Sequence, residues 1–427
     1  MAATPYAFYR GTDHLYWRDF SNGRGSKKFS TPKTKTWLQG DLHAYNFGTF
    51  KNDKWELVYG LNDFDEAVVS DYQYDVWRMA VSLILIAREN GKSAKSDEKK
   101  FVATFADSYL KQLKILSKNN KGEKIAYTSK QAGSPLKEFM KIIEVKKTKT
   151  REKMLEKWTT KGRFNTSLEK LGKIDNKRRK IIVEAIEGKK GGKSQYRKTL
   201  KGALENKKSS YFKVLDVAER LLAGTGSLGT KRYYVLLEGD KSKGSDDIIL
   251  DIKHQGTSSP YPYLNKADRK LYCFVNEAER TIEGYRALGI KTNDHLGWIK
   301  LPQMGKDAPA GYYSVRERNP KKGSYPALTS DLKKSMKGLT LKKKAHFLGM
   351  CEQWGKILAI SHARADNDVN KGRIKHSLEK EVSRVTKGKE KTFCKLVCDI
   401  ATDYADQVAK DYKYFIGWFD ASKCPKF

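Results

Sequence analysis

The sequence has 427 residues, of which 39% are hydrophobic and 32% charged, and its formal net charge is +35. A chain of this length can bury a large core, and we expect two lobes with an insertion. The longest apolar run, 80–87, is far too short to span a bilayer, and residues 1–10 lack the apolar region of a signal peptide. Five scattered cysteines exclude a disulfide framework. We therefore expect a soluble, cytoplasmic protein.

The first motif, Gly-Asp-Leu-His-Ala-Tyr-Asn at 40–46, is followed after a short gap by Asp-Phe-Asp at 63–65. Asp41 and Asn46 are five positions apart, as the Asp and Asn are in a kinase catalytic loop. In that chemistry one carboxylate meets the attacking hydroxyl, while an amide oxygen and a second carboxylate hold a metal ion. A polar turn and an acidic turn between strands would give the same pattern, so the motif needs support elsewhere.

Two helices are predicted next, at 74–89 and 98–116. Asp75 lies at the start of the first, where we expect it to cap the helix or to bond back to the 40–46 loop. A basic, mostly helical insertion is predicted at 116–215. Within it, residues 141–210 contain 23 Lys or Arg against 8 Asp or Glu. This excess favours binding of a polyanion such as nucleic acid, an anionic lipid surface or a phosphorylated molecule, although lysine-rich faces often have no dedicated partner.

A glycine-rich turn, GxGxxG at 224–229, follows a short helix predicted at 214–222. Strand-like runs at 232–237 and 248–253 come after it, and Lys253 ends the second run. Such a turn between strands lets backbone amides approach phosphate oxygens, and a lysine on a neighbouring strand reaches the same phosphates. A dinucleotide-binding turn would need a helix after the glycines, so the kinase type of turn fits better.

A helix is predicted at 276–288, and it offers Glu277, Glu279 and Glu283 as the carboxylate that a kinase uses to hold the strand lysine. We favour Glu283, although an exposed helix with solvated glutamates has the same sequence. Further helices are predicted at 342–364 and 391–411. The catalytic loop comes before the glycine-rich turn, the reverse of the usual kinase order, which indicates a circular permutation. The helix at 342–364 would then lead in space into residues 36–41.

These segments resemble the bacterial family called domain of unknown function 2252, which belongs with protein-kinase-like and aminoglycoside-phosphotransferase-like proteins. The matching segments are 5–11, 40–48, 61–67, 74–83, 224–239, the lysine strand at 248–253, 282–288, 312–318, the end of the helix at 361–365, and 404–415. Gln39 stands where aminoglycoside-type enzymes usually carry His, and residues 117–209 match no family motif.

The resemblance implies an α+β, two-lobed, protein-kinase-like fold that is circularly permuted and carries the basic helical insertion. Its parts would be a first section of the large lobe at 1–115, the insertion at 116–215, the small lobe at 216–320, and the rest of the large lobe at 321–427. ATP would lie in the cleft between the lobes.

The resemblance also implies a role for each candidate residue. Asp41 would act as the base or orient the acceptor hydroxyl, and His43 would brace the loop. Asn46 and Asp63 would bind Mg²⁺, with Asp65 as a second ligand or a loop cap. ATP phosphates would be contacted by Lys253, which Glu283 would hold, and covered by Gly224, Gly226, Ser227 and Gly229.

The implied activity is ATP- and Mg²⁺-dependent transfer of a γ-phosphoryl group to a hydroxyl of a small-molecule, phosphorylated or protein acceptor. Nucleotidyl transfer on the same fold stays open. The alternative is a binding protein rather than an enzyme, namely a catalytically inactive kinase-like module that binds a nucleotide or polyanion as a scaffold. Asp41, Asn46, Asp63 and Lys253 together favour the enzyme, because an inactive site has no physical need for all of them.

Overall fold

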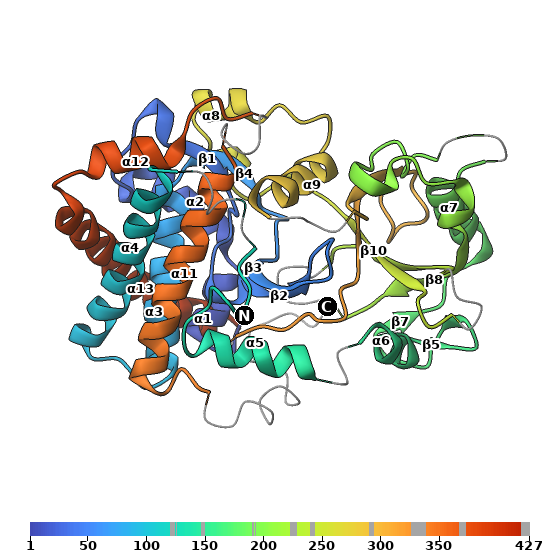
Figure 1. The fold of residues 1–427 in the computed structure, drawn as a ribbon, viewed down its shortest axis with the longest axis horizontal. Helices are drawn as coiled ribbons and strands as arrows, with labels where there is room; N and C mark the ends of the chain where they lie inside the picture. Colours follow the sequence, from blue (N-terminus) through green and yellow to red (C-terminus); the bar gives the residue numbers. More distant parts are fainter. Residues whose placement is uncertain are drawn as a thin grey trace.

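The computed structural model describes residues 1–119, 124, 126–146, 150–189, 192, 194–222, 229–239, 244–289, 294–325, 339–366 and 373–419. It is a mixed α/β structure with a largely helical lobe and a second lobe built on one sheet. In Figure 1 the helical lobe lies on the left and the sheet lobe on the right, with α9 (Glu277–Leu288) between them.

The helical lobe is assembled from both ends of the chain. One hydrophobic core runs through it from Tyr6 to Val408. Its helices are α1 (Pro5–Arg10), α2 (Asp13–Asp19), α3 (Gln73–Glu89), α4 (Lys95–Leu116), α11 (Lys344–Arg364), α12 (Leu378–Thr386) and α13 (Glu390–Phe419). Helix α4 packs along α11, and α13 packs on both α3 and α4. The side chains of α3 are buried on almost every face because α3 lies at the centre of this packing.

Two short antiparallel ladders carry the loops of the first motifs. Strand β1 (Lys35–Leu38) pairs with β4 (Val68–Asp71), and β2 (Phe47–Lys51) pairs with β3 (Leu57–Leu61). Residues 39–46 therefore connect β1 to β2, and residues 62–67 connect β3 to β4. Because the strands pair, the two loops emerge side by side.

The second lobe contains one antiparallel sheet with the strand order β11-β12-β10-β9-β8-β7. The strands are β7 (Leu171–Gly172), β8 (Val214–Arg220), β9 (Arg232–Leu237), β10 (Ile248–His254), β11 (Gly297–Leu301) and β12 (Gly311–Glu317). Helix α9 follows β10 in the chain and packs on β11 and β12, and it also contacts β1 of the helical lobe. This helix therefore links the two lobes.

The helices predicted at 74–89, 98–116, 276–288, 342–364 and 391–411 are confirmed. Their boundaries agree within three residues, except that the last helix continues to Phe419. The short helix predicted at 214–222 is wrong, because Val214–Arg220 is strand β8. Its apolar residues form too short a run to separate a helix from a strand by periodicity. The strand is stabilised by its pairing with β9 and by the burial of Val217 and Ala218.

The segment 116–215 does not form a separate helical unit. Helix α5 (Leu136–Val145) buries its apolar face in the helical lobe, whereas α7 (Asn176–Glu187) packs on the sheet. Helix α6 (Arg151–Trp158) contributes Trp158 to a small cluster on the other face of the sheet. The short strands β5 (Thr159–Thr160) and β6 (Arg163–Phe164) pair with each other, and β7 joins the main sheet. Both lobes thus incorporate parts of the basic segment.

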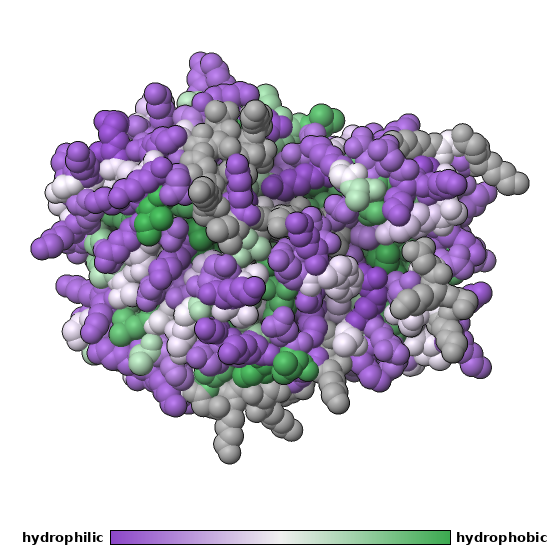
Figure 2. All heavy atoms as spheres, in the orientation of Figure 1, coloured by the Kyte–Doolittle hydropathy of each residue, from purple (hydrophilic) through white to green (hydrophobic). Residues whose placement is uncertain are grey.

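The face of the molecule seen in Figure 2 is predominantly hydrophilic. Among the residues that the structure describes, no helix has the length and apolar character needed to cross a membrane. Cys394 and Cys398, one turn apart on α13, have free thiols.

Candidate active site

The two predicted loops meet in one acidic pocket. Asp41 and Asn46 line it from the first loop, and Asp63 and Asp65 line it from the second. The other residues around it are Arg10, Gly11, Asp13, His14, Gln39, Glu66 and Ser259. The structure therefore brings together the four residues predicted for the base and the metal site.

The approach of the loops depends on a glycine. Gly40 has φ of +89°, and a Cβ atom on it would lie 2.0 Å from the carbonyl oxygen of Glu66. Such a contact is impossible for other residues, and the positive φ also favours glycine. Gly40 therefore lets the first loop pass directly against the second.

Asp75 holds the first loop from the start of α3. Its carboxylate accepts hydrogen bonds from the backbone amides of Gln39 and Gly40 at 2.7 and 3.1 Å. His362 at the end of α11 lies 3.2 Å from the same carboxylate, and its carbonyl accepts a bond from Thr36 at 3.1 Å. The predicted bond from Asp75 back to the loop is confirmed, and so is the predicted approach of the α11 end to residues 36–41.

Arg78 is the residue of the site that the sequence analysis missed. Its fully buried guanidinium donates to Oδ1 of Asp41 at 2.9 Å and lies 3.0 Å from the Asp13 carboxylate. The rings of Tyr9 and Tyr16 flank it at 4.4 and 4.9 Å. A single arginine in the apolar run of α3 was the available signal, because an unpaired charge there would be very costly.

The surroundings of Asp41 set its protonation. Burial raises the pKa of this carboxyl to about 7, although Arg78 beside it favours the ionised form. Oδ1 is occupied by Arg78, whereas Oδ2 faces His43 Nε2 at 3.7 Å. Burial lowers the pKa of His43 well below its usual range, so its imidazole is neutral near pH 7. Oδ2 is therefore the oxygen of Asp41 that remains for a ligand in the pocket.

Asn46 lies in the short 3-10 turn before β2. Its side-chain nitrogen donates to the backbone carbonyl of Asp41 at 2.9 Å, and its backbone carbonyl accepts from Asn62 at 3.1 Å. The side-chain bond uses the nitrogen of the amide, so the amide oxygen is the atom left for a metal ion or ligand.

Asp65 and Lys253 connect the lobes across the pocket. The ammonium of Lys253, from β10, pairs directly with Oδ2 of Asp65, and Gln255 donates to Oδ1 at 2.9 Å. Although burial acts in the opposite direction, Lys253 holds the pKa of Asp65 well below its usual range. For Asp63, burial and the nearby Asp65 raise the pKa. The two carboxylates therefore differ: Asp65 is ionised and paired, and Asp63 faces the pocket.

The prediction that Glu283 holds Lys253 is wrong. Glu283 bonds to Lys201 and Arg286 at 3.1 and 2.8 Å. The face of α9 that points towards the site carries Thr281 and Tyr285 instead, which bond to Gln255 and to the backbone of Asn62.

An α-helix turns 100° per residue, so position 283 lies almost opposite position 281. The side chains of Glu277 and Glu279, the other two candidates, accept bonds from Arg280 and from the backbone amide of Val275. Asp65 is the carboxylate that pairs with Lys253.

The glycine-rich turn is only partly within the described residues. Gly224, Gly226 and Ser227 lie outside them, whereas Gly229 is described and has φ of +74°. The flanking strands β8 and β9 pair antiparallel. The strand before the turn replaces the predicted helix at 214–222, and the conformation of the turn and its contact with phosphates stay predictions.

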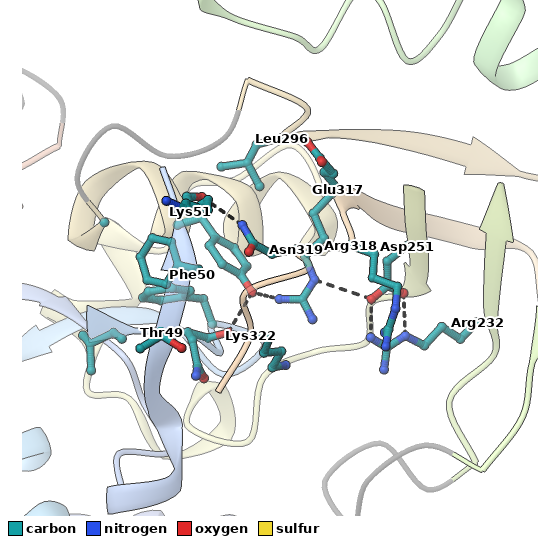
Figure 3. A pocket seen from close by; sticks show the side chains of 16 residues that line it. Thr49, Phe50, Lys51, Arg232, Asp251, Leu296, Glu317, Arg318, Asn319 and Lys322 are labelled. Carbon is teal, nitrogen blue, oxygen red and sulfur yellow. Dashed lines mark hydrogen bonds and ion pairs between the residues drawn. The ribbon is translucent and has the colours of Figure 1, made fainter. Parts of the chain in front are cut away.

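A second cavity lies behind the acidic pocket, between β2–β3 and the sheet (Figure 3). It contains about 880 Å³ of space not filled by protein atoms, including part that is open to solvent. Asn62 and Phe64 line this cavity, whereas Asp63 and Asp65 line the acidic pocket. Alternate residues of one short loop thus face two adjoining spaces, as expected of extended backbone.

The cavity combines apolar and charged side chains. Its wall includes Phe50, Leu61 and Leu296, and its charged residues are Lys51, Arg232, Asp251, Arg316, Glu317, Arg318 and Lys322. Part of the surface of Lys322 remains open, but the surrounding protein and the neighbouring arginines lower its pKa to about 8.

A family model matches residues 1–417, which include both lobes and every candidate residue. The chain belongs to the domain of unknown function 2252 family, described as an uncharacterized protein conserved in bacteria. Neither the curated proteins nor the solved structures contain a match.

In this member of the domain of unknown function 2252 family, a magnesium site would have few protein ligands. Among the described residues, no three His, Cys, Asp or Glu side chains are grouped closely enough to hold a metal ion. Mg²⁺ beside nucleotide phosphates is commonly bound by only one or two carboxylates, with phosphate and water oxygens completing its coordination. The carboxylate of Asp63 and the amide oxygen of Asn46 are hard oxygen donors in one pocket, so they fit such a site.

The basic segment contributes exposed lysines mainly on the sheet lobe. Lys153 and Lys157 are exposed on α6, and Lys177 and Lys180 are exposed on α7. Lys153 pairs with Glu156 at 2.6 Å. Polyanion binding by residues 141–210 stays a prediction.

Proposed function

We propose that this protein is an ATP- and Mg²⁺-dependent phosphotransferase with a circularly permuted, protein-kinase-like fold. The observation that carries the proposal is the convergence of Asp41, Asn46, Asp63 and Asp65 in one pocket, together with the pairing of Asp65 with Lys253 of the other lobe. Kinase-type catalysis needs a base or hydroxyl-orienting carboxylate, metal ligands and a strand lysine at one place.

The order of elements in the sheet lobe supports the kinase-like interpretation. Strand β8, the glycine-containing segment, β9 and β10 with Lys253 follow one another in the chain, and α9 comes after the short helix α8 (Lys266–Leu271). Protein kinases likewise carry a glycine-rich loop, a lysine on the third strand and a helix that positions it.

The packing of the first described helix against the last described helix supports the permutation. Helix α1 packs on α13, and Tyr412 donates to the carbonyl of Ala2 at 2.7 Å. Neighbouring termini allow a chain to be reconnected at another point without a change in packing.

In this proposal, the hydroxyl oxygen of the acceptor attacks the γ-phosphorus of ATP. The bond between that phosphorus and the β–γ bridging oxygen breaks, ADP leaves, and the hydroxyl proton passes to Oδ2 of Asp41. A pKa of about 7 suits this transfer, because a base works best when its pKa is close to the working pH. Arg78 and Asp75 keep the Asp41 loop in position, and Lys253 would bind phosphate oxygens.

Asp63 and Asn46 would hold the Mg²⁺, which supplies charge neutralisation for the phosphates when it is bound. The acceptor is assigned only by class, as a molecule with a hydroxyl that reaches Asp41. The side of the pocket formed by Arg10, Asp13 and His14 is where such a molecule would contact the chain.

The proposal is tested by ATP consumption in the presence of Mg²⁺, with Asp63→Asn as the variant. We expect at least a hundredfold loss of turnover, because removal of a metal ligand weakens stabilisation of the transferred group. Asp53→Asn is the matched control, since Asp53 is exposed at the turn between β2 and β3. Equal turnover by wild type and Asp63→Asn would refute the assignment of this pocket.

A further inference from the structure

The segment that leaves β10 lies along the second loop of the acidic pocket. Its first residue, Gln255, donates to Oδ1 of Asp65 at 2.9 Å. The backbone amide of Ser259 donates to the neighbouring carboxylate, that of Glu66, at 2.5 Å. Consecutive residues of the helical lobe therefore hold both ends of the stretch 255–259, and Ser259 has a fixed position beside the loop.

The side chain of Ser259 belongs to the pocket. Ser259 is half-buried and lines the pocket together with Asp41 and Asp63. Its hydroxyl hydrogen-bonds to the same Glu66 carboxylate that accepts its backbone amide. A hydroxyl that already donates to a carboxylate has a proton acceptor in place, which is the arrangement that activates a serine for attack.

The other hydroxyls of this stretch are placed differently. Ser258 is buried, and its hydroxyl shares a hydrogen bond with the hydroxyl of Tyr272 at 3.2 Å. Thr257 is exposed. Neither is among the described residues that line the acidic pocket. Of the three successive hydroxyl residues, Ser259 is therefore the one presented to the proposed site.

Glu66 connects the Ser259 segment to the Asp41 loop. Its carbonyl lies directly against Gly40, the residue before Asp41, where a Cβ atom would be only 2.0 Å away. The hydroxyl of Ser259 is thus held next to the loop that would orient an acceptor. A hydroxyl fixed within a reaction pocket has a large entropic advantage over one that must diffuse into it.

We propose that Ser259 is a phosphorylation site at which this chain modifies itself, with the Ser259 hydroxyl as the acceptor in the acidic pocket. This inference rests on the proposed function, which supplies ATP as the phosphoryl donor. Oγ of Ser259 forms a bond to the γ-phosphorus, the bond from that phosphorus to the β–γ bridging oxygen breaks, and ADP leaves with its electron pair. The hydroxyl proton passes to the Glu66 carboxylate.

The test incubates the full chain with Mg²⁺–ATP and locates phosphate on its peptides by mass spectrometry. We expect phosphate on Ser259 of the wild type and almost none on the whole Ser259→Ala chain. Thr257→Ala is the matched control, because Thr257 is an exposed hydroxyl of the same stretch, and it should be modified as fast as wild type. Circular dichroism verifies that each variant is folded.

The rate of modification tests whether the reaction is intramolecular. Its rate constant should not change when the protein is diluted, because donor site and acceptor belong to one chain. A rate constant that falls in proportion to protein concentration would overturn modification of the chain by itself. Glu66→Gln keeps an acceptor for the Ser259 amide but cannot take the proton, so it should slow the modification about a hundredfold. An unchanged rate in Glu66→Gln would overturn the role of Glu66.

Asp63→Asn separates this inference from the proposed function. It should stop both ATP turnover and modification of Ser259. Asp63-dependent ATP turnover without phosphate on Ser259 would overturn the inference and leave the proposed function in place. No turnover and no modification in wild type would refute both. An adenylyl group on Ser259, which the peptide mass distinguishes from phosphate, would overturn phosphoryl transfer and support nucleotidyl transfer to the same hydroxyl.

Discussion

Two carboxylates that line the acidic pocket, Asp41 and Asp65, are held in different ways. Asp41 is fixed within the helical lobe by Arg78, which Asp13 and two tyrosine rings hold in turn. Asp65 is fixed between the lobes, by Lys253 and Gln255 of the sheet. The position of Asp41 should therefore persist when the lobes move, whereas that of Asp65 should depend on their closure.

Loss of Arg78 is the strongest test of the Asp41 side. Arg78→Met removes the cation between Asp13 and Asp41 and leaves two buried carboxylates close together. We expect the free energy of unfolding to fall by about 3–5 kcal/mol, as measured by urea denaturation.

Arg18→Met is the matched control, because Arg18 forms an exposed pair with Asp19 at 2.9 Å. Its effect should be below about 1 kcal/mol. Similar effects of the two substitutions would show that Arg78 is not the centre of a buried network.

Asp75→Ala tests the support of the loop itself. It leaves the amides of Gln39 and Gly40 without their acceptor, and an unsatisfied buried amide costs about 1–3 kcal/mol. We expect a total loss of about 2 kcal/mol, because water can enter the space that the carboxylate leaves. Hydrogen exchange at both amides should become faster, while the amides of β9 keep their protection. Unchanged exchange at residues 39 and 40 would contradict this role.

The sequence predicts much of the site because its motifs are local. Asp41 and Asn46 share one loop, Asp63 and Asp65 share the next, and the glycine at position 40 lets the loops touch. Spacing in the chain is sufficient to find such groups, and the helices around them follow from apolar periodicity.

The sequence does not predict contacts that depend on the rotation of an element or on distant packing. The chemistry of a carboxylate on α9 favours Glu283, yet the rotation of α9 places Thr281 towards the site instead. The pairing of Arg78 with Asp13 joins residues far apart in sequence. Strand β8 was mistaken for a helix because only its pairing with β9 distinguishes the two. The rotation of α9, the Arg78–Asp13 pair and the pairing of β8 with β9 can each be identified only in the folded structure.

The pH dependence of stability should differ between wild type and Asp41→Asn. The pKa of Asp41 is raised to about 7 in the folded chain, so between about pH 4 and 7 the folded chain keeps a proton that the unfolded chain has lost. The contribution of this group to stability is therefore present at low pH and falls as the pH rises through that window.

Arg78 and partial contact with solvent favour the ionised form of Asp41. We therefore expect this carboxyl to change the free energy of unfolding by only about 1 kcal/mol across the pH range. Thermal or urea unfolding of both proteins from pH 4.5 to 7.5 measures it, and the Asn variant has no such titration. Parallel stability curves would show that Asp41 ionises at its ordinary pKa.

The smallest effect is expected for Glu283→Gln. This variant tests whether Asp65 alone, and not Glu283, positions Lys253. Glu283 bonds to Lys201 and Arg286 on the face of α9 away from Lys253, so its loss should cost less than about 1 kcal/mol of stability. Affinity for Mg²⁺–ATP, measured by calorimetry, should stay within about twofold of wild type.

Asp65→Asn provides the contrast, because it removes the charged partner of Lys253 and keeps the shape of the side chain. We expect it to weaken the affinity for Mg²⁺–ATP about tenfold, since one charged contact contributes about 1.5 kcal/mol. If Glu283→Gln changed nucleotide affinity as much as Asp65→Asn does, α9 would have to rotate when the nucleotide binds, and Glu283 would hold Lys253 in that state. Equal affinity of wild type and Glu283→Gln leaves Asp65 as the carboxylate that positions Lys253.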